Sequence, residues 1–521
     1  MALPGWLTEK RGPSVGRRTG AVHLGRLCAG FAAVTLLVGC TGAEGSPSVH
    51  VDAVEPLVVP AEGDEPPAEP VPLANDAHRS SPGVVASGGA SAPYNYGPTV
   101  LRDGGRYRAW WCSQVPYSPP PGDDILHAEA TEPGGQYRAA DGSPAVAVFS
   151  GNPGGFDGMH TCDPSVIKVD GVYYLYYTGA PGDHADGNAI GVASSHDGLS
   201  WTRLAEGQPV VTAAEDEIRD NAYGAGQPAV LHLDGWFHVM FTDTTAAAAG
   251  WNGAGQFVLR ARDPEFRTDL QALTEDGFRP VASAAEPRTF SVVDAFSADW
   301  MWVEALDAFA IAHQTETGTS ITFWDREFRY HPYQRILVEG PWREGPGLVR
   351  DPLGHAPTSV TDPCGRVPID LLRATTEETA PTGIAHFGLD IHGIDGCRDQ
   401  DRAAAVLDGF AVPSPERTVD LVVDGALVRV ERRSVAERLA VRVLDERVPA
   451  LEGLPVIARV NPGATVVNAP DRPLALLLED DRLWPVVDPE VAELNDSTIV
   501  DTSVERWERH ELGAVLHAGS R

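Results

Sequence analysis

Two aspartates stand at equivalent points of a repeated pattern, where paired carboxylates could carry out acid–base chemistry. Asp163 precedes Pro164 and Asp299 precedes Trp300, in each case at the start of an apolar, strand-like run. Two carboxylates brought to one site can divide the roles of proton donor and base. We therefore predict Asp163 and Asp299 as catalytic residues. The alternatives are a turn-capping aspartate at 163 and a rim aspartate beside core tryptophans at 299.

Seven further side chains have the chemistry to bind a hydroxylated ligand. Amide and phenol groups exchange hydrogen bonds with hydroxyls, imidazoles also transfer protons, and an indole offers a flat apolar face. Loop structure is the alternative for the amides and the tyrosine, a structural role for the histidines, and core packing for the tryptophan. The candidate binding residues are Asn95, Tyr96, His160, Gln227, Asp243, Trp300 and His355.

These candidates fall within a repeat whose copies start at residues 97, 163, 227, 299 and 355. Each copy pairs a short apolar run with a second apolar or aromatic run. An Asp-Gly turn separates the two runs in the first three copies, as at Asp170-Gly171. Asp-Gly between two such runs is a strong hairpin signal. The repeat therefore predicts at least two paired strands in each copy.

Four of the copies also have a second strand-like half, clearest at 189–201 and weaker at 125–137, 257–266 and 321–328. Four strands per unit, repeated at the spacing of the five copies, are typical of a β-propeller. We expect an all-β chain with a five-bladed β-propeller over residues 91–405. Residues 410–521, where 444–449 resembles 479–485, predict a small β-rich accessory domain.

The N-terminal stretch has the features of an export signal. Five basic residues precede the apolar run 27–38, which is shorter than the ~20 residues that a membrane-spanning helix needs. The run ends in Leu37-Val38-Gly39-Cys40, which resembles a bacterial lipobox. We expect residues 1–39 to be a lipoprotein signal peptide, with Cys40 carrying lipid. Residues 40–90, rich in Pro, Gly, Ser and Glu, predict a disordered tether.

Composition limits the possible partners of the chain. The 521 residues carry a formal net charge of −33, which argues against nucleic acid because a phosphate binder needs a basic face. Of the six cysteines, Cys28 lies in the signal and Cys40 would carry lipid, so four remain for disulfides: Cys112, Cys162, Cys364 and Cys397. An even number outside the cytoplasm favours disulfides, and four cysteines allow three pairings.

The strand pattern resembles the five-bladed glycoside hydrolases of the arabinanase/β-xylosidase family 43 and its invertase-like relatives. The resemblance covers about residues 94–395 and is most specific at Asp163-Pro164-Ser165-Val166 and at Ser195-x-Asp197-Gly198-x-x-Trp201. It implies that the first residue of each inner strand faces a central funnel, where three carboxylates cleave the glycosidic bond. The matching positions here are Gly97, Asp163 and Gln227. Only the second carboxylate is present, so any further acid or base must come from elsewhere on the rim.

The resemblance also implies how the cysteines pair. Cys112 would end an outgoing strand of the first blade and Cys162 would begin the inner strand of the second. We therefore expect the pairs Cys112–Cys162 and Cys364–Cys397. The tripeptide Arg350-Asp351-Pro352 matches a motif of the invertase-like enzymes, but there it belongs to an earlier blade, so we assign it no role.

We therefore expect a lipoprotein on the outer face of the bacterial cytoplasmic membrane that acts on a polysaccharide or oligosaccharide. A glycoside hydrolase is the first hypothesis and a non-catalytic glycan-binding lipoprotein is the alternative. The membrane is contacted by the lipid anchor only, and no nucleic acid is bound. No cofactor is predicted, although the sequence is compatible with a calcium ion in the funnel. No Cys/His cluster in the sequence has zinc spacing.

Overall fold

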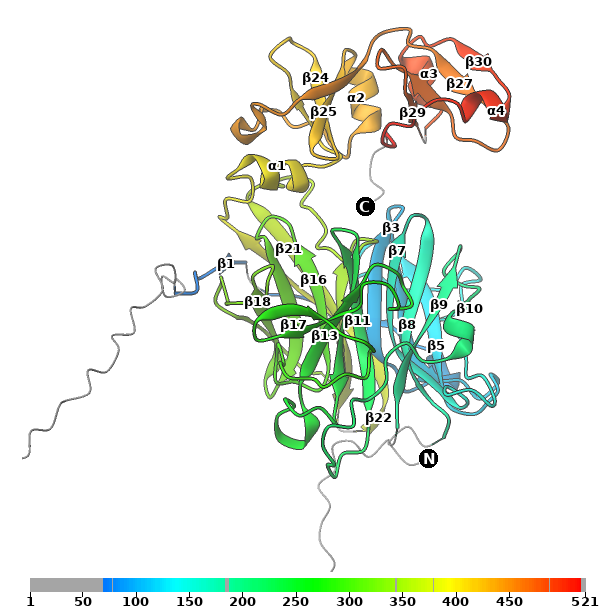
Figure 1. The fold of residues 1–521 in the computed structure, drawn as a ribbon, viewed down its shortest axis with the longest axis vertical. Coiled ribbons are helices and arrows are strands. Elements are labelled where there is room, and N and C mark those ends of the chain that lie inside the picture. Colours follow the sequence, from blue (N-terminus) through cyan, green and yellow to red (C-terminus); the bar gives the residue numbers. More distant parts are fainter. Residues whose placement is uncertain are drawn as a thin grey trace, which may run out of the picture. The chain divides into compact units, whose positions relative to one another are not determined.

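The computed structural model describes residues 69–516, apart from 77, 183–186, 343, 378 and 487. The predicted signal peptide, Cys40 and the tether up to residue 68 lie outside the described residues. Within these residues the chain is nearly all-β, with four short α-helices (Figure 1). No helix in this part is long and apolar enough to cross a membrane.

The first three units of the fold follow the predicted repeat. Each begins with an antiparallel pair joined by a turn with two positive φ angles, such as Asp170 and Gly171 at 50° and 79°. The Asp-Gly hairpins are thereby confirmed. The strands are β3 Tyr96–Asp103, β4 Arg106–Gln114, β5 Asp123–Ala130 and β6 Val146–Phe149; β7 His160–Val169, β8 Val172–Ala180, β9 Ala189–Ser195 and β10 Thr202–Arg203; β11 Ala225–Leu233, β12 Trp236–Asp243, β13 Gln256–Ala261, β14 Gln271–Thr274 and β15 Gly277–Pro280.

The fourth unit is a further four-stranded sheet, and the fifth is completed from the other end of the chain. In the fifth unit β22 pairs with both β1 and β2, which come from the N-terminal side of the first unit. The strands of the fourth unit are β16 Ala298–Val303, β17 Ala308–Thr315, β18 Gly318–Trp324 and β19 Ile336–Glu339. Those of the fifth are β20 Pro346–Arg350, β21 Arg366–Glu377, β22 Thr379–His392, β1 Ala74–Asn75 and β2 Arg79–Ala86.

Two sequence boundaries need correction. The tether predicted for 40–90 in fact contains β1 and β2. The sequence did not indicate β2, because the polar, Pro-containing segment 79–86 becomes a strand only by pairing with β22. Proline is tolerated in such an edge strand. The fifth copy does not start at His355 but at Gly345, directly before β20. A long loop, not an Asp-Gly turn, joins β20 to β21, so the hairpin signal is missing there.

The first strands of the five units contact one another in order. Contacts run from β3 to β7, β11, β16 and β20, and β20 returns to β3 through the parallel pairs Val349–Val100 and Arg350–Leu101. The two predicted disulfides are both present, Cys112–Cys162 between the first and second units and Cys364–Cys397 after β20. These bonds confirm the pairing.

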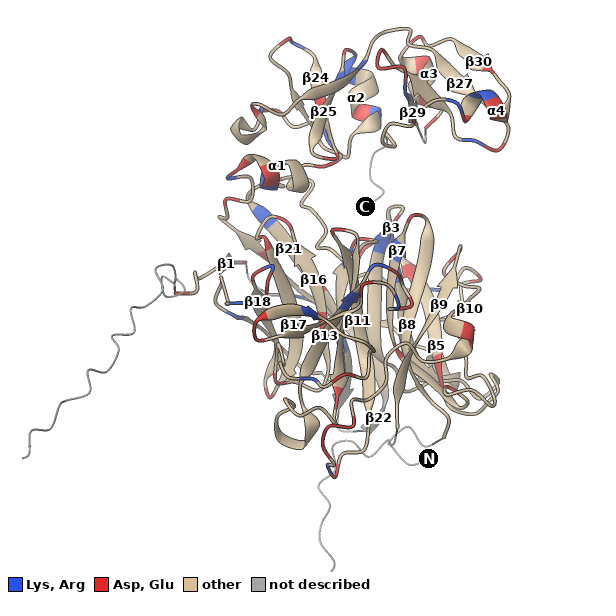
Figure 2. Cartoon of the chain, in the orientation of Figure 1, with Lys and Arg blue, Asp and Glu red and all other residues tan. Residues whose placement is uncertain are grey.

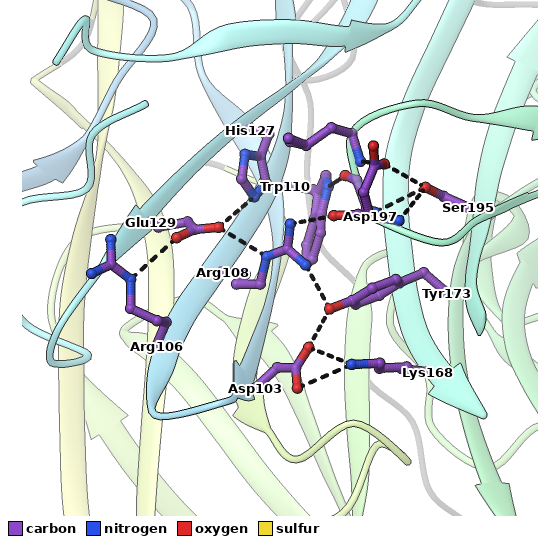
Figure 3. Close-up of polar contacts among 12 residues, drawn as sticks. Asp103, Arg106, Arg108, Trp110, His127, Glu129, Lys168, Tyr173, Ser195 and Asp197 are labelled. Atoms are coloured by element: carbon purple, nitrogen blue, oxygen red, sulfur yellow. Dashed lines mark hydrogen bonds and ion pairs between the residues drawn. The ribbon is translucent and has the colours of Figure 1, made fainter. Parts of the chain in front are cut away.

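The motif around Asp197 holds the second unit against the first. The Asp197 carboxylate accepts backbone hydrogen bonds from Leu199 and Ser200, both at 2.7 Å. On the outside of this turn, Arg108 of the first unit donates to the Asp197 carbonyl at 2.6 Å and to the Tyr173 hydroxyl at 2.6 Å (Figure 3). This specific part of the family resemblance is therefore a packing motif between two sheets.

The remaining chain forms two smaller sheets with short helices. The elements are α1 Gln400–Val406, β23 Ala411–Pro413, β24 Val419–Val423, β25 Ala426–Val430, α2 Arg433–Leu439 and β26 Val456–Val460, then β27 Val466–Asn468, β28 Ala475–Leu477, β29 Leu483–Pro485, α3 Glu490–Leu494, β30 Ile499–Asp501 and α4 Val504–Trp507. Both sheets add one parallel pair to antiparallel ones. Asp and Glu, red in Figure 2, are scattered over the molecule rather than gathered on one element.

Candidate functional site

The five first strands begin around one small pocket. Its walls are Gly97 to Thr99, Asp163 to Ser165, Gln227 and Pro228, Ser297 to Asp299, and Glu344 to Pro346. The pocket is open to solvent and its volume is about 30 Å³, which is room for about one water molecule. A larger ligand would therefore lie over the mouth of the pocket and send only one small group into it.

Four of the five units enter the pocket through the same backbone conformation. Gly97, Asp163, Gln227 and Gly345 have φ angles of 55°, 47°, 51° and 57°, and a proline follows each of them. Register shifts accompany the first three of these residues. A non-glycine residue in this region costs roughly 1–2 kcal/mol, and functional sites are one place where such strained residues cluster. Asp163 and Gln227 are the two residues that carry it here.

Asp163 is a half-buried carboxylate with hydroxyl partners. The Tyr223 hydroxyl donates to Asp163 Oδ2 at 3.4 Å. A Cβ atom at Gly97 would lie 3.2 Å from Asp163 Oδ1, so glycine leaves this oxygen room on the first unit's side. Burial raises the pKa of Asp163 to about 7, and the nearby charge of Asp123 adds to the rise, whereas the hydroxyls of Thr178 and Tyr223 oppose it. A substantial fraction of this group therefore holds a proton at neutral pH.

Glu344 is a second carboxylate of the pocket wall, and it contacts another pocket residue. The sequence did not indicate it. Gln227 Nε2 donates to Glu344 Oε1 at 3.3 Å, and the Ser297 hydroxyl donates to the other end of the same amide. Gln227 also donates its backbone N–H to Thr178 Oγ1 at 2.8 Å. Gln227 is thus fixed as a hydrogen-bonding partner of Glu344. A Gly-Pro pair at 345–346, matching that at 97–98, is the sequence signal that would have located this position.

Asp299, the second predicted catalytic residue, lines the pocket but is already engaged. It accepts the backbone N–H of Trp300 at 2.9 Å and of Leu348 at 2.8 Å, and it lies 3.2 Å from an Arg350 guanidinium nitrogen. Burial raises the pKa of Asp299, while Arg350 and the two N–H groups oppose the rise. These partners hold β16 to β20, which is a structural role.

Arg350, which belongs to the tripeptide that we assigned no role, is fully buried where the first strands meet. Its guanidinium donates to the carbonyls of Val230 and Trp300 at 3.0 and 3.2 Å, and to the hydroxyls of Thr99 and Ser165 at 2.8 and 3.4 Å. One side chain of β20 therefore joins the other four first strands. The positive charge of the buried Arg350 guanidinium disfavours a second cation where the first strands meet.

Tyr96 and His160 form a buried group behind the pocket. The Tyr96 hydroxyl donates to Asp123 Oδ2 at 3.2 Å, and the same oxygen lies 3.1 Å from His160 Nδ1. Burial raises the pKa of Tyr96 well above its usual range. Within the described residues, Asp123 also belongs to the one three-residue group close enough to hold a metal, but its other two members are Cys112 and Cys162, which are joined in a disulfide.

Four predicted binding residues lie elsewhere. Asn95 is fully buried, where it accepts from Gly88 N–H and Trp111 Nε1 and donates to two carbonyls. Asp243 accepts the backbone N–H of Ala214 and of Thr245, at 2.8 and 3.0 Å, and so ties loops of the third unit together. Neither side chain lines the pocket.

Trp300 and His355 require the clearest corrections. Trp300 is fully buried and stacks on Phe309, with ring centroids 5.2 Å apart, so its face is covered. His355 lies after β20, at the opposite end of the strands, where it pairs with Glu304 and contacts the His232 carbonyl at 2.8 Å. Both predictions relied on the position of a residue in the repeat, which does not reveal what packs against it.

No protein-family model and no curated protein matches this chain. Among solved structures, a family 117 glycoside hydrolase from the marine bacterium Zobellia galactanivorans matches at 12% identity and a TM-score of 0.43, over 61% of this chain and 92% of its own. An α-L-arabinofuranosidase from Podospora anserina matches at 10% identity and a TM-score of 0.38, over 62% and 99%.

A third match is the catalytic domain of a family 62 α-L-arabinofuranosidase from Coprinopsis cinerea, at 12% identity and a TM-score of 0.39, over 61% of this chain and 98% of its own. These neighbours are glycoside hydrolases. At such identities and TM-scores, the likeness assigns no activity to this chain. The proposals below therefore depend on the chain's own residues.

Proposed function

We propose that this protein is an exported, lipid-anchored glycoside hydrolase whose site lies at the pocket of a five-bladed β-propeller. The five units with their first strands in cyclic contact support the propeller. The observation that carries the activity is that Asp163 and Glu344 line one pocket, the first with a pKa near neutrality. Glycoside cleavage needs one carboxyl group that is protonated and one that is not.

In this proposal Asp163 is the proton donor. A pKa of about 7 leaves a usable proton at neutral pH and favours its transfer to the oxygen of the leaving sugar. Tyr223 holds the carboxyl group through Oδ2. The other oxygen, Oδ1, lies on the Gly97 side, where the absence of a side chain leaves space for the substrate.

Glu344 is the partner carboxylate. The Gln227 amide contacts one of its oxygens at 3.3 Å and, with Ser297, fixes its direction. An ionised Glu344 activates a water molecule or attacks the sugar carbon itself. Gln227 thus occupies the position where the resembled family has an acid, and it serves here to orient a carboxylate from the fifth unit.

The test is hydrolysis of soluble arabinan, xylan, fructan and cell-wall glycans by the mature protein. We expect sugar release from at least one of them, and a loss of at least about 100-fold in kcat for D163N and E344Q, the size usual for removal of a general acid or base. D276N, which changes a strongly exposed carboxylate of the β14–β15 turn, is the matched control and should retain full activity. Unchanged activity in D163N or E344Q would refute this assignment.

A non-catalytic glycan-binding protein is the second candidate. Its support is specific: Gly97 and Gln227 stand where the resembled family has carboxylates, and Asp299 is ion-paired with Arg350. Glycan-array binding with no sugar released, in both the wild type and D163N, would favour this second function.

A further inference from the structure

We infer that Trp251 forms a stacking platform for a sugar ring beside the pocket, so that the ligand is an extended polysaccharide or oligosaccharide chain. This inference deepens the proposed function and rests on it for the identity of the ligand. Trp251 lies in the short 3₁₀ turn Trp251–Gly253 between β12 and β13, and 88% of its surface is exposed. An exposed indole offers a flat apolar face with an N–H at its edge, which is the chemistry that a sugar ring requires of a binding surface.

The loop that carries Trp251 lies at the pocket end of the third unit. Asp243 at the end of β12 pairs with Ala225 at the start of β11, next to the pocket residue Gln227. The same loop packs against the segment that leads into β16. Gly255 donates its backbone N–H to the Ala295 carbonyl at 3.1 Å, and Gln256 donates to the Phe296 carbonyl at 2.9 Å. Ser297, the next residue, is part of the pocket wall.

Hydrogen bonds and close packing hold the backbone of the turn that carries the indole. The Gly250 N–H donates to the Ala254 carbonyl at 2.6 Å, and Asn221 Nδ2 donates to the Asn252 carbonyl at 3.0 Å. Its two glycines are tightly packed, because a Cβ at Gly250 would lie 2.4 Å from Asp294 and one at Gly253 would lie 2.6 Å from Thr244. A turn whose backbone is already ordered loses little backbone entropy on binding.

The groups around the indole fit a carbohydrate. The Asp294 carboxylate lies directly against Gly250, and Asn252 follows Trp251 on the exposed turn. An apolar face next to amide and carboxylate oxygens complements the C–H face and the hydroxyls of a sugar ring. Because the pocket itself has room for only about one water molecule, the rest of a ligand must lie across this rim.

The topologically equivalent loop of the first unit supports this inference. The segment between β4 and β5 carries Tyr117, which is 66% exposed. Among the described residues, the two most exposed aromatic side chains therefore lie on equivalent loops at the pocket end. The next, Tyr330, is 40% exposed and follows β18 at the opposite end.

The experiment measures binding separately from turnover. Affinity electrophoresis in gels containing soluble arabinan, xylan or fructan gives a dissociation constant for each polysaccharide whether or not it is cleaved. We expect W251A to bind at least about tenfold more weakly than the wild type to the polysaccharide it recognises. W251F should retain part of the affinity, and Y330A, an aromatic control at the far end, should bind as the wild type does.

The outcomes separate this inference from the hydrolase proposal. Binding that depends on Trp251 without sugar release supports the platform and refutes the hydrolase. Hydrolysis with the same dissociation constant and KM in W251A refutes the platform and leaves the hydrolase in place. If none of the three polysaccharides is bound, the platform is refuted as stated. The circular dichroism spectrum and melting temperature of W251A should match the wild type, since the side chain is exposed.

Discussion

At the scale of single residues, the pocket contains one carboxylate that the sequence predicts, Asp163, and one that it does not, Glu344. Asp163 was predicted from its place at a strand start before proline, and the structure places it on the pocket wall. Glu344 lies in the loop before β20, where the repeat was misaligned. A pairing of two carboxylates across the fifth and second units depends on ring closure, which a local pattern does not reveal.

The raised pKa of Asp163 predicts how the stability of the protein depends on pH. The folded-state pKa is about 7, above the ~3.9 of an unfolded aspartate. The stabilising effect of the bound proton is therefore complete below about pH 4 and is lost as the pH rises through about 7. Relative to a variant that stays neutral at this position, the wild type should lose stability from pH 5 to pH 8.

The D163N variant tests this prediction, because asparagine stays neutral and accepts a left-handed backbone. At pH 8 we expect D163N to be about 1 kcal/mol more stable than the wild type, a value reduced for partial exposure, while at pH 5 the difference should be roughly a third as large. Urea unfolding at the two pH values measures the difference. An equal gap at pH 5 and pH 8 would show that Asp163 is ionised throughout.

Other residues illustrate what sequence position does not determine. Trp300 and Asp299 stand in the right register of the fourth unit, yet Phe309 covers the first and Arg350 pairs with the second. Arg350 belongs to a tripeptide that looked coincidental, but it contacts all four other first strands. The roles of Asp299 and Arg350 are set by neighbours far away in the chain, whereas Trp300 is covered by Phe309 of the strand paired with its own.

At the scale of elements, the strands that carry their own signals were predicted well. Asp-Gly turns with apolar and aromatic runs identified β3, β4, β7, β8, β11 and β12, and the family resemblance predicted both disulfides. The failures have a common cause. Neither missed strand has a local sequence signal. The first strand of the fifth unit, β20, spans only Pro346–Arg350 and has no tight turn after it. Strand β2 forms only because β22 offers an unpaired edge.

The closing strand β2 leads to a prediction about truncation. It buries Val85 and Ala86, and Arg79 pairs with Asp370 and Asp390 at 2.6 and 3.0 Å. A protein that begins at residue 88 lacks these contacts and exposes the edge of β22. We expect it to be roughly 3–5 kcal/mol less stable, mainly from the lost apolar burial and strand hydrogen bonds.

The control for this truncation is a protein that begins at residue 69, immediately before the described strands. It should unfold at the same guanidinium concentration as the mature protein, since it retains both β1 and β2. If the two truncated proteins have equal midpoints, β2 contributes nothing to the closure of the fifth unit.

At the scale of the whole molecule, residues beyond the boundary predicted at about 410 have an apolar core of their own, and a second cluster extends across that boundary. One cluster of buried residues includes Met301 and Leu389 of the fourth and fifth units together with Phe410 and Leu427 of the C-terminal sheets. The pattern of the sequence changes at this point, but the apolar packing continues across it. The C-terminal region therefore contributes to the stability of the fourth and fifth units.

The N-terminal side of β1 connects this folded part to the predicted anchor at Cys40. Several acyl chains bind a membrane durably, because each buried CH₂ contributes about 0.8 kcal/mol and one chain alone gives only marginal binding. We expect the wild type to incorporate a fatty-acid label in a bacterial host and to enter the detergent phase in a phase-partition assay. C40S should lose the label and enter the aqueous phase. C28S, which changes the other cysteine of the same leader, should keep it, and labelled C40S protein would exclude Cys40 as the acylation site.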